Sequence, residues 1–263
     1  KFEKKINNFL KCKYSTVCNS GTSALFIAFQ SINIKKDDVV IMPSINFIAS
    51  YNVAKLFGAK IFLADVNKYT GQMSPENIFD CCKKFNLKKI KAIVLMYNGG
   101  YPDNSERFNL LKKKYKCYLV EDACHAFGST YKSKGKNYKI GSCKHSDIAT
   151  FSLHPLKTIT TGEGGIVTTN DEKLDNKMKK IRSLGIKKNK KKHWDYDVVE
   201  NGFNFRLTDF QCALGISQLS KVDYFIKKRK KIADKYISAL KKINSIIIPE
   251  YKNKYLSSHH LFL

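Results

Sequence analysis

The sequence contains no apolar run of about 18 residues, which is the length that a membrane-spanning helix requires. Its first residues, KFEKKINNFLKCKY, lack the apolar stretch of a signal peptide. It also has no internal repeat and no linker rich in proline or glycine. These absences predict a cytoplasmic protein that does not associate with a membrane. The 263 residues, 43% of them hydrophobic, suffice for one large folded domain or one and a half.

No two cysteines have the C-x-x-C spacing of many zinc and redox sites, although the chain has eight cysteines. Several of the eight lie inside apolar, strand-like runs. This pattern favours reduced and mostly buried thiols over a disulfide framework, and it predicts no metal site.

Arginine is scarce, because only four of the 48 basic residues are arginines and the rest are lysines. The net charge of +26 would suit a protein that binds nucleic acid. Nucleic-acid readers, however, favour arginine at base edges, and no basic motif interleaved with aromatic residues occurs here. We therefore interpret the lysines as solvated surface residues, and the dense run KKNKKKHW at 187–194 as an exposed loop. A basic, non-enzymatic nucleic-acid-binding protein is the alternative.

Short apolar runs of strand length alternate with helix-like stretches along the chain. This alternation predicts an α/β fold with a mostly parallel central sheet and helices on both faces. The expected strands are DVVIMP, KIFLAD, KAIVLMY, CYLVEDA, DIATFSL and GIVTTN. Helices are expected from about Thr22, after the good N-cap Ser74, and over 104–115. Residues 217–240 favour one long amphipathic helix, and further strands are expected at SIIIPE and SSHHLFL.

Polar motifs follow several of these strands, at the strand ends where α/β proteins bind ligands. In NSGTSAL, residues 19–25, a turn of small residues opens a helix. Its free N–H groups and dipole would hold a phosphate, helped by the Thr22 or Ser23 hydroxyl. In YLVEDACHAFGS the strand ends at Asp122, whose carboxylate can hold a protonated ring nitrogen, and His125 follows. An ordinary helix cap is the alternative for both motifs.

Lys157 follows the strand of FSLHPLKTITTGEGG, residues 151–165, and no other lysine comes within the next ten residues. A lysine that forms a Schiff base must be partly desolvated so that its amine is free. A strand end beside a glycine-rich turn supplies such a place, with Ser152 nearby in the sequence. One more surface lysine is the alternative.

A fourth motif, ENGFNFRLTDFQCALGISQL, places Asn204 and Arg206 just before a helix. Polar residues in that position often serve a site, although a simple cap by Thr208 explains the motif equally well.

Together these motifs resemble the DegT/DnrJ/EryC1/StrS family of sugar-nucleotide aminotransferases, which use pyridoxal 5′-phosphate (PLP). The matching segments are NSGTSAL, PSINFIAS, VEDACHAFGS, SDIATFSLHPLKTITTGEGGIVTTN and GFNFRLTDFQCALGISQL. They occur in the family's order and at its spacing, over nearly the whole chain. The resemblance implies the PLP-dependent transferase type I fold, with the start of a smaller C-terminal domain.

The resemblance implies a role for each catalytic candidate. Lys157 matches the lysine that forms a Schiff base with PLP and shuttles a proton between cofactor and substrate. Asp122 matches the carboxylate that keeps the pyridine nitrogen protonated, so that the ring serves as an electron sink. His125 is similar to the partner of the cofactor's phenolic oxygen.

Other residues match the family's cofactor-binding positions. Phe47 falls where the family stacks an aromatic side chain on the ring, and Gly21, Thr22 and Ser152 match phosphate contacts. Asn204 matches a residue that reaches the phosphate from the neighbouring subunit, which implies a homodimer with shared active sites.

The segments SCKHSDIATFSLHPLKTITTGEGG and HWDYDVVENGFNFRLTD resemble the branch that acts in pseudaminic acid biosynthesis, a route to cell-surface polysaccharide. This implies transfer of an amino group from L-glutamate to UDP-2-acetamido-2,6-dideoxy-β-L-arabino-hexos-4-ulose. Other UDP- or dTDP-linked 3- or 4-keto sugars, of the perosamine or bacillosamine type, are alternatives. A dehydratase branch of the family is disfavoured, since it has histidine where this chain has Lys157.

By the same resemblance, residues 1–220 are the large PLP-binding domain, and residues 221–263 are the connecting helix and the start of the small domain. Family members extend beyond both ends of this sequence, so we expect both domains to be incomplete here. Cys124 also departs from the family, where alanine is commoner, and a small hydrophobic residue is tolerated against the ring face.

Overall fold

The computed structural model describes residues 1–102, 105–189, 194–249 and 255–263. Its centre is a seven-stranded sheet in the order β1-β9-β8-β5-β4-β2-β3. The strands are β1 (Tyr14–Cys18), β2 (Val39–Pro43), β3 (Lys60–Ala64), β4 (Ala92–Met96), β5 (Tyr118–Asp122), β8 (Ile148–Ser152) and β9 (Gly165–Thr169). Strand β9 is antiparallel to both of its neighbours, and the pairs from β8 to β3 are all parallel. The predicted mostly parallel sheet is therefore confirmed.

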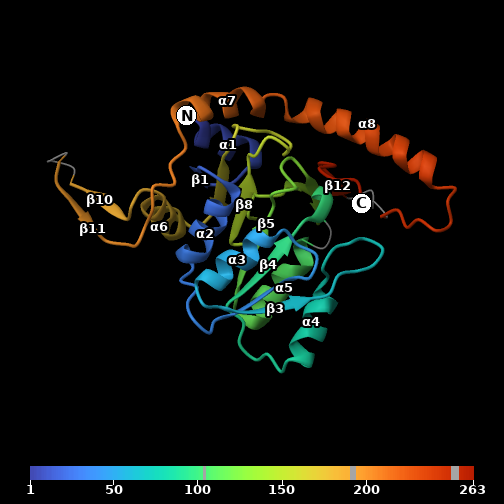
Figure 1. Cartoon of the computed structure of the whole chain (residues 1–263), viewed down its shortest axis with the longest axis horizontal. Helices are drawn as coiled ribbons and strands as arrows, with labels where there is room; N and C mark the ends of the chain where they lie inside the picture. Colours follow the sequence, from blue (N-terminus) through green and yellow to red (C-terminus); the bar gives the residue numbers. More distant parts are fainter. Residues whose placement is uncertain (103–104, 190–193, 250–254) are drawn as a thin grey trace.

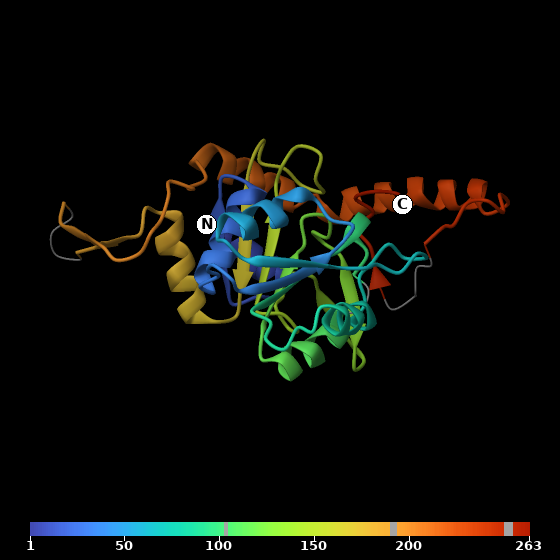
Figure 2. The same cartoon turned by 60° about the horizontal axis from the view of Figure 1, so that its bottom comes forward.

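Helices cover both faces of this sheet, as predicted (Figures 1 and 2). One core forms between the sheet and α2, α3 and α6, and a second between the sheet and α1, α4, α5 and the start of α8. Neighbouring residues of one strand serve opposite cores, as Leu119 and Val120 of β5 do. The helices are α1 (Phe2–Leu10), α2 (Gly21–Ser31), α3 (Ile48–Leu56), α4 (Pro75–Lys84), α5 (Ser105–Tyr115), α6 (Glu172–Arg182), α7 (Asp209–Leu219) and α8 (Val222–Leu240).

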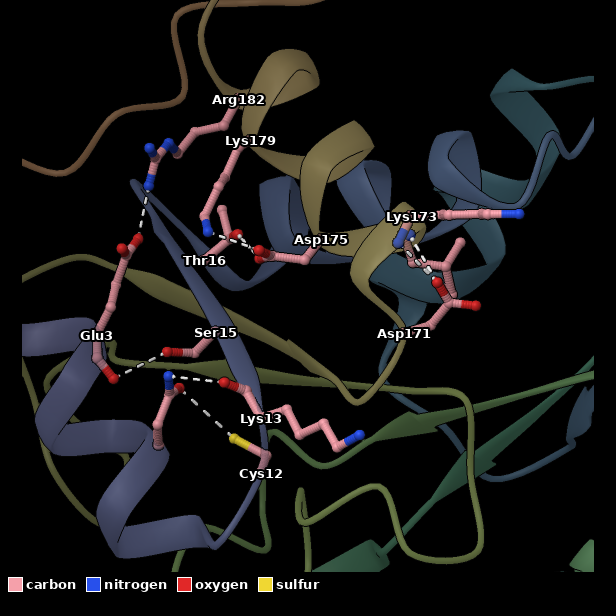
Figure 3. A network of polar contacts seen from close by, with 12 residues as sticks. Glu3, Cys12, Lys13, Ser15, Thr16, Asp171, Lys173, Asp175, Lys179 and Arg182 are labelled. Carbon is pink, nitrogen blue, oxygen red and sulfur yellow. Dashed lines mark hydrogen bonds and ion pairs between the residues drawn. The ribbon is translucent and has the colours of Figure 1, made fainter.

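A polar network fastens α1 and α6 to the edge strand β1 (Figure 3). Glu3 Oε1 accepts hydrogen bonds from Arg182 Nη1 at 2.7 Å and from the Val17 N–H at 3.0 Å. On the same strand, Thr16 Oγ1 donates to Asp175 Oδ1 at 3.4 Å, and Asp175 also pairs with Lys179 of its own helix. The network holds β1, the strand that leads into the NSGTSAL turn.

The chain beyond the sheet differs from the sequence prediction. The expected single helix over 217–240 is two helices, because α7 ends at Leu219 and α8 starts at Val222. Neither residues 245–249 nor SSHHLFL form a strand. The short strand β12 (Tyr255–Leu256) pairs instead with β6 (Thr130–Ser133), which also pairs with β7 (Lys136–Lys139). Apolar runs predicted these strands, but an apolar run forms a strand only where it pairs with a neighbour, and here Tyr255 and Leu256 make that pairing. Glu250, the last residue of SIIIPE, lies outside the described residues.

The basic run KKNKKKHW is only partly a loop. Its first two lysines are exposed, as expected, but they belong to β10 (Ile186–Lys188), which pairs with β11 (Tyr196–Val198). Residues 190–193 of the run lie outside the described residues.

The cysteines are all free thiols, and six of the eight are buried, as their strand-like surroundings predict. Burial raises the pKa of Cys12 and of Cys18 to about 12, so both are protonated thiols that pack as small hydrophobic groups. Among the described helices, none combines the length and the apolar character needed to cross a bilayer.

Phe151 tests the contribution of the core under the site. Its side chain is fully buried on β8 and packs edge-on against Phe127, with ring centroids 5.2 Å apart. We expect Phe151→Ala to lower the free energy of unfolding by about 3–5 kcal/mol, because it leaves a cavity. Leu110→Ala, at a side chain that is 68% exposed, is the control and should change it by less than about 0.5 kcal/mol. Urea unfolding followed by circular dichroism measures both, and equal effects would contradict the assignment of the core.

Candidate active site

Lys157 lies in a tight turn that follows β8. Its N–H donates to the His154 carbonyl at 2.9 Å. Buried Leu153 anchors the turn. Its N–H donates to the Gly164 carbonyl at 2.7 Å, and its carbonyl accepts from the Thr161 N–H at 3.0 Å. The side chain of Lys157 lines a cavity of about 620 Å³. The fold thus brings this lysine to the end of the sheet, at the edge of a hollow that can hold a small molecule.

Asp122 lines the same cavity from the end of the neighbouring strand β5. It is 1% exposed, and its Oδ1 accepts the Cys124 N–H at 3.3 Å. Burial raises its pKa, while the bonds from Cys124 and the charge of Lys157 oppose that shift. A buried carboxylate of this kind is stabilised by a cationic donor, and a protonated pyridine nitrogen is one.

The N-terminus of α2 forms another wall of the cavity. Ser20 caps the helix, and its Oγ accepts the Ser23 N–H at 3.0 Å. Gly21 sits so close to β8 that a Cβ there would lie 2.8 Å from the Cβ of Ser152. The first N–H groups of a helix have no acceptor within the helix, so Gly21, Thr22 and Ser152 together present donors suited to a phosphate.

Phe47 also lines the cavity, at the N-cap of α3, with 63% of its side chain exposed. Six of the eight residues singled out in the sequence therefore meet in one hollow. They are Gly21, Thr22, Phe47, Asp122, Ser152 and Lys157.

His125 is not itself among the residues that line the cavity, although it packs against His260, which lines it. Its ring is buried and packs against the ring of His260, with centroids 4.3 Å apart, and its Nδ1 has no hydrogen-bond partner among the described residues. Burial lowers its pKa to about 3, and the nearby His260 and Lys157 act in the same direction. The ring is therefore neutral, with a nitrogen that a bound group can satisfy.

Asn204 does not reach this cavity. It is exposed, it forms an isolated bridge with Ser183, and it lies in the stretch before α7. Arg206 of the same motif lines a separate hollow with Phe2 and Asp209. The predicted cap of α7 is present, because Thr208 and Gln211 form a capping box.

Two polar residues of the cavity lie outside the four motifs of the sequence. Arg229 comes from α8 and His260 from the last residues of the chain. The N–H of His260 donates to the Gly99 carbonyl at 2.9 Å, which holds this segment against the loop after β4. Its place beside the other site residues depends on a tertiary contact. The scarcity of arginine in the sequence was the one signal that could have drawn attention to Arg229.

The residues present fit PLP. Lys157 offers an amine for the aldehyde, Asp122 a buried carboxylate for the ring nitrogen, and the start of α2 a cradle for the phosphate. Two structural features support this fit. At Gly21 there is no room for a Cβ, and the Nδ1 of His125 has no hydrogen-bond partner among the described residues.

The chain is similar to several known proteins. The sequence model of the DegT/DnrJ/EryC1/StrS aminotransferase family matches residues 1–263. The chain is 39% identical over 264 aligned residues to the UDP-4-amino-4,6-dideoxy-N-acetyl-beta-L-altrosamine transaminase of Campylobacter jejuni subsp. jejuni serotype O:23/36 (strain 81-176). That alignment covers 99% of this chain and 66% of the relative. The GDP-perosamine synthase of Escherichia coli O157:H7 is 36% identical, with 94% of this chain and 63% of the relative covered.

A solved structure gives the same result for the fold. An aminotransferase of Helicobacter pylori, involved in the biosynthesis of pseudoaminic acid, superimposes with a TM-score of 0.86 at 31% identity. The match covers 99% of this chain and 67% of that structure. The chain thus spans about two thirds of the length of the relatives that it matches.

The buried histidine gives the site a measurable dependence on pH. The pKa of His125 is lowered from 6.5 to about 3. Between these pH values His125 is protonated in the unfolded chain but neutral in the folded protein. Stability should be full above pH 6.5 and should fall as the pH decreases towards 3. His125→Gln should flatten this fall, as measured by urea unfolding at several pH values.

The control is His154→Gln, at a ring that is 44% exposed, which should leave the profile unchanged. If the His125→Gln protein lost stability with acid as steeply as the unchanged chain, a neutral, buried His125 would be ruled out.

Proposed function

The chain belongs to the DegT/DnrJ/EryC1/StrS aminotransferase family, and we propose that it transfers an amino group from L-glutamate to a nucleotide-linked 4-keto-6-deoxy sugar, with PLP as cofactor. The observation that carries this proposal is the meeting of Lys157, Asp122 and the start of α2 in one cavity. An amine, a buried carboxylate and a phosphate cradle form the set of groups that such a cofactor needs.

Each site residue has a separate role in the proposed reaction. When bound, PLP supplies the electron sink that stabilises a carbanion. Lys157 Nζ would move a proton between the substrate carbon and the cofactor carbon in each half of the reaction. Asp122 would keep a positive charge on the ring nitrogen, and Gly21, Thr22 and Ser152 would hold the phosphate. Phe47 would cover the ring, and we assign His125, whose Nδ1 has no hydrogen-bond partner among the described residues, to the cofactor's phenolic oxygen.

For the sugar we propose UDP-2-acetamido-2,6-dideoxy-β-L-arabino-hexos-4-ulose, which places the protein in pseudaminic acid biosynthesis. The 39% identity to the altrosamine transaminase and the likeness to the Helicobacter pylori aminotransferase support this choice. The 36% identity to a GDP-perosamine synthase supports a second candidate, amination of a different nucleotide-linked keto sugar.

We also propose a cytoplasmic homodimer in which each site is completed by the partner. Leu156 beside Lys157 is 72% exposed and Phe210 at the start of α7 is 91% exposed, so apolar surface is left uncovered near the site. Asn204 lies outside the cavity of its own chain, which suits a residue that serves the site of the other subunit. The large domain would end near residue 220, in the break between α7 and α8.

A substrate panel tests the reaction. The full-length protein is incubated with PLP, L-glutamate and a set of UDP-, GDP- and dTDP-linked 3- and 4-keto sugars, and NMR identifies the carbon that carries the new amino group. We expect amination at C4 of the UDP-linked sugar. Amination of dTDP sugars alone, or at C3 alone, would replace the proposed substrate.

The lysine has a direct test. Lys157→Ala should abolish turnover and the visible absorption band that forms when PLP is added to the protein, because the amine is lost. Lys173→Ala, at an exposed lysine of α6, is the matched control and should behave like the unchanged protein. A Lys157→Ala protein that still forms the band would refute the assignment.

Mixing variants tests the shared site. Lys157→Ala and Asn204→Ala proteins should each be poorly active, and subunit exchange between them should restore part of the activity. The mixed dimer contains one site with both residues intact if Asn204 acts across the interface. No gain on mixing, in a sample shown to contain mixed dimers, would place Asn204 outside the partner's site.

A further inference from the structure

Arg229 is a cation of the cavity that the proposed reaction leaves without a role. It lines the cavity from α8, where it is half-buried, and its Nη1 donates to the His260 carbonyl at 3.3 Å. Burial lowers its pKa, but a guanidinium stays charged at physiological pH. Solvent reaches this half-buried charge, and a carboxylate or an anionic ligand would compensate it further.

The described residues do not supply that compensation. Among them, no carboxylate lies within ion-pair distance of Arg229. Of the two carboxylates that line the cavity, Glu163 is 3.8 Å from the Nε2 of His154, and Asp122 is buried at the end of β5. The guanidinium of Arg229 therefore lines the hollow with the His260 carbonyl as an acceptor and with no carboxylate partner among the described residues.

The neighbouring His260 also favours an anion in this part of the cavity. The Nδ1 of His260 is buried and has no hydrogen-bond partner among the described residues. Burial, together with the charges of Lys157 and Arg229, lowers the pKa of His260 to about 4. Lys157 and Arg229 thus place two positive charges near this ring, and an anion in the cavity would be attracted by both.

We propose that Arg229 binds an anionic oxygen group of a substrate, either a carboxylate of the amino donor or the diphosphate of the nucleotide sugar. The inference rests on the proposed function, because that function assigns Lys157 to the cofactor and leaves Arg229 as the cation for the substrates. The planar guanidinium can make two parallel hydrogen bonds to either group.

Steady-state kinetics of three variants test the proposal. Arg229→Met removes the charge and keeps most of the chain length, and Arg229→Lys keeps the charge but not the two-pronged geometry. Lys227→Met removes an exposed charge from the same helix and is the control. We expect Arg229→Met to raise KM for one substrate on the order of tenfold or more, with a smaller change in kcat. Arg229→Lys should have a smaller effect, and Lys227→Met none.

The two substrates distinguish the source of the anion. A higher KM for L-glutamate assigns Arg229 to the carboxylate, and a higher KM for the nucleotide sugar assigns it to the diphosphate. If neither changes in the folded variants, or if Lys227→Met has as large an effect as Arg229→Met, the proposal is wrong. Circular dichroism establishes folding, and Arg229→Lys provides the test should Arg229→Met fail to fold.

Binding measured without turnover separates this inference from the proposed function. Calorimetry gives the dissociation constants of glutarate, a dicarboxylate with no amino group, and of UDP. If no keto sugar is aminated but one of these anions binds in an Arg229-dependent way, the proposed function fails and the anion site stands. If turnover occurs but both dissociation constants and both KM values are independent of Arg229, the anion site alone is refuted.

Discussion

The candidate site depends on the close packing of the first turn of α2 against the ends of β8 and β9. A Cβ on Gly165 would collide with the backbone carbonyl of Ser20, and a Cβ on Gly21 would press on Ser152. With glycine at both positions the helix start approaches the sheet, and its N–H groups lie beside the turn that carries Lys157. A larger side chain at either glycine would separate the phosphate cradle from the lysine.

Burial at the same sheet end sets the electrostatics of the site. Asp122 and Val120 lie on the α2 side of β5, while Glu121 faces the other side and accepts hydrogen bonds from Tyr97 and Gly141. Burial raises the pKa of both carboxyl groups, that of Glu121 to about 7. Glu121 has protein donors, whereas Asp122 opens onto the cavity. Adjacent carboxylates on one strand therefore have different surroundings, because one lies within the fold and the other lines the cavity.

Residues 255–263 contribute to the cavity, although they are far in the sequence from the strands of the central sheet. Ser258 donates through Oγ to the His125 carbonyl at 2.5 Å, and its N–H donates to Ser129 Oγ at 2.9 Å. These bonds anchor the segment that carries His260, and α8 brings Arg229 to the same place. The side of the cavity that Arg229 and His260 line is thus built by elements outside the central sheet.

The sequence by itself determined the alternating strands and helices and the cap at Ser74. It also determined the motifs that place Gly21, Asp122 and Lys157 at strand ends. All of these follow from local patterns of burial and capping. The sequence-based prediction failed at residues 245–249 and at SSHHLFL, where apolar character alone gives no strand. Only the tertiary structure decided that Arg229 and His260 join the cavity. Their positions depend on contacts between segments remote in the chain, and no local pattern encodes such contacts.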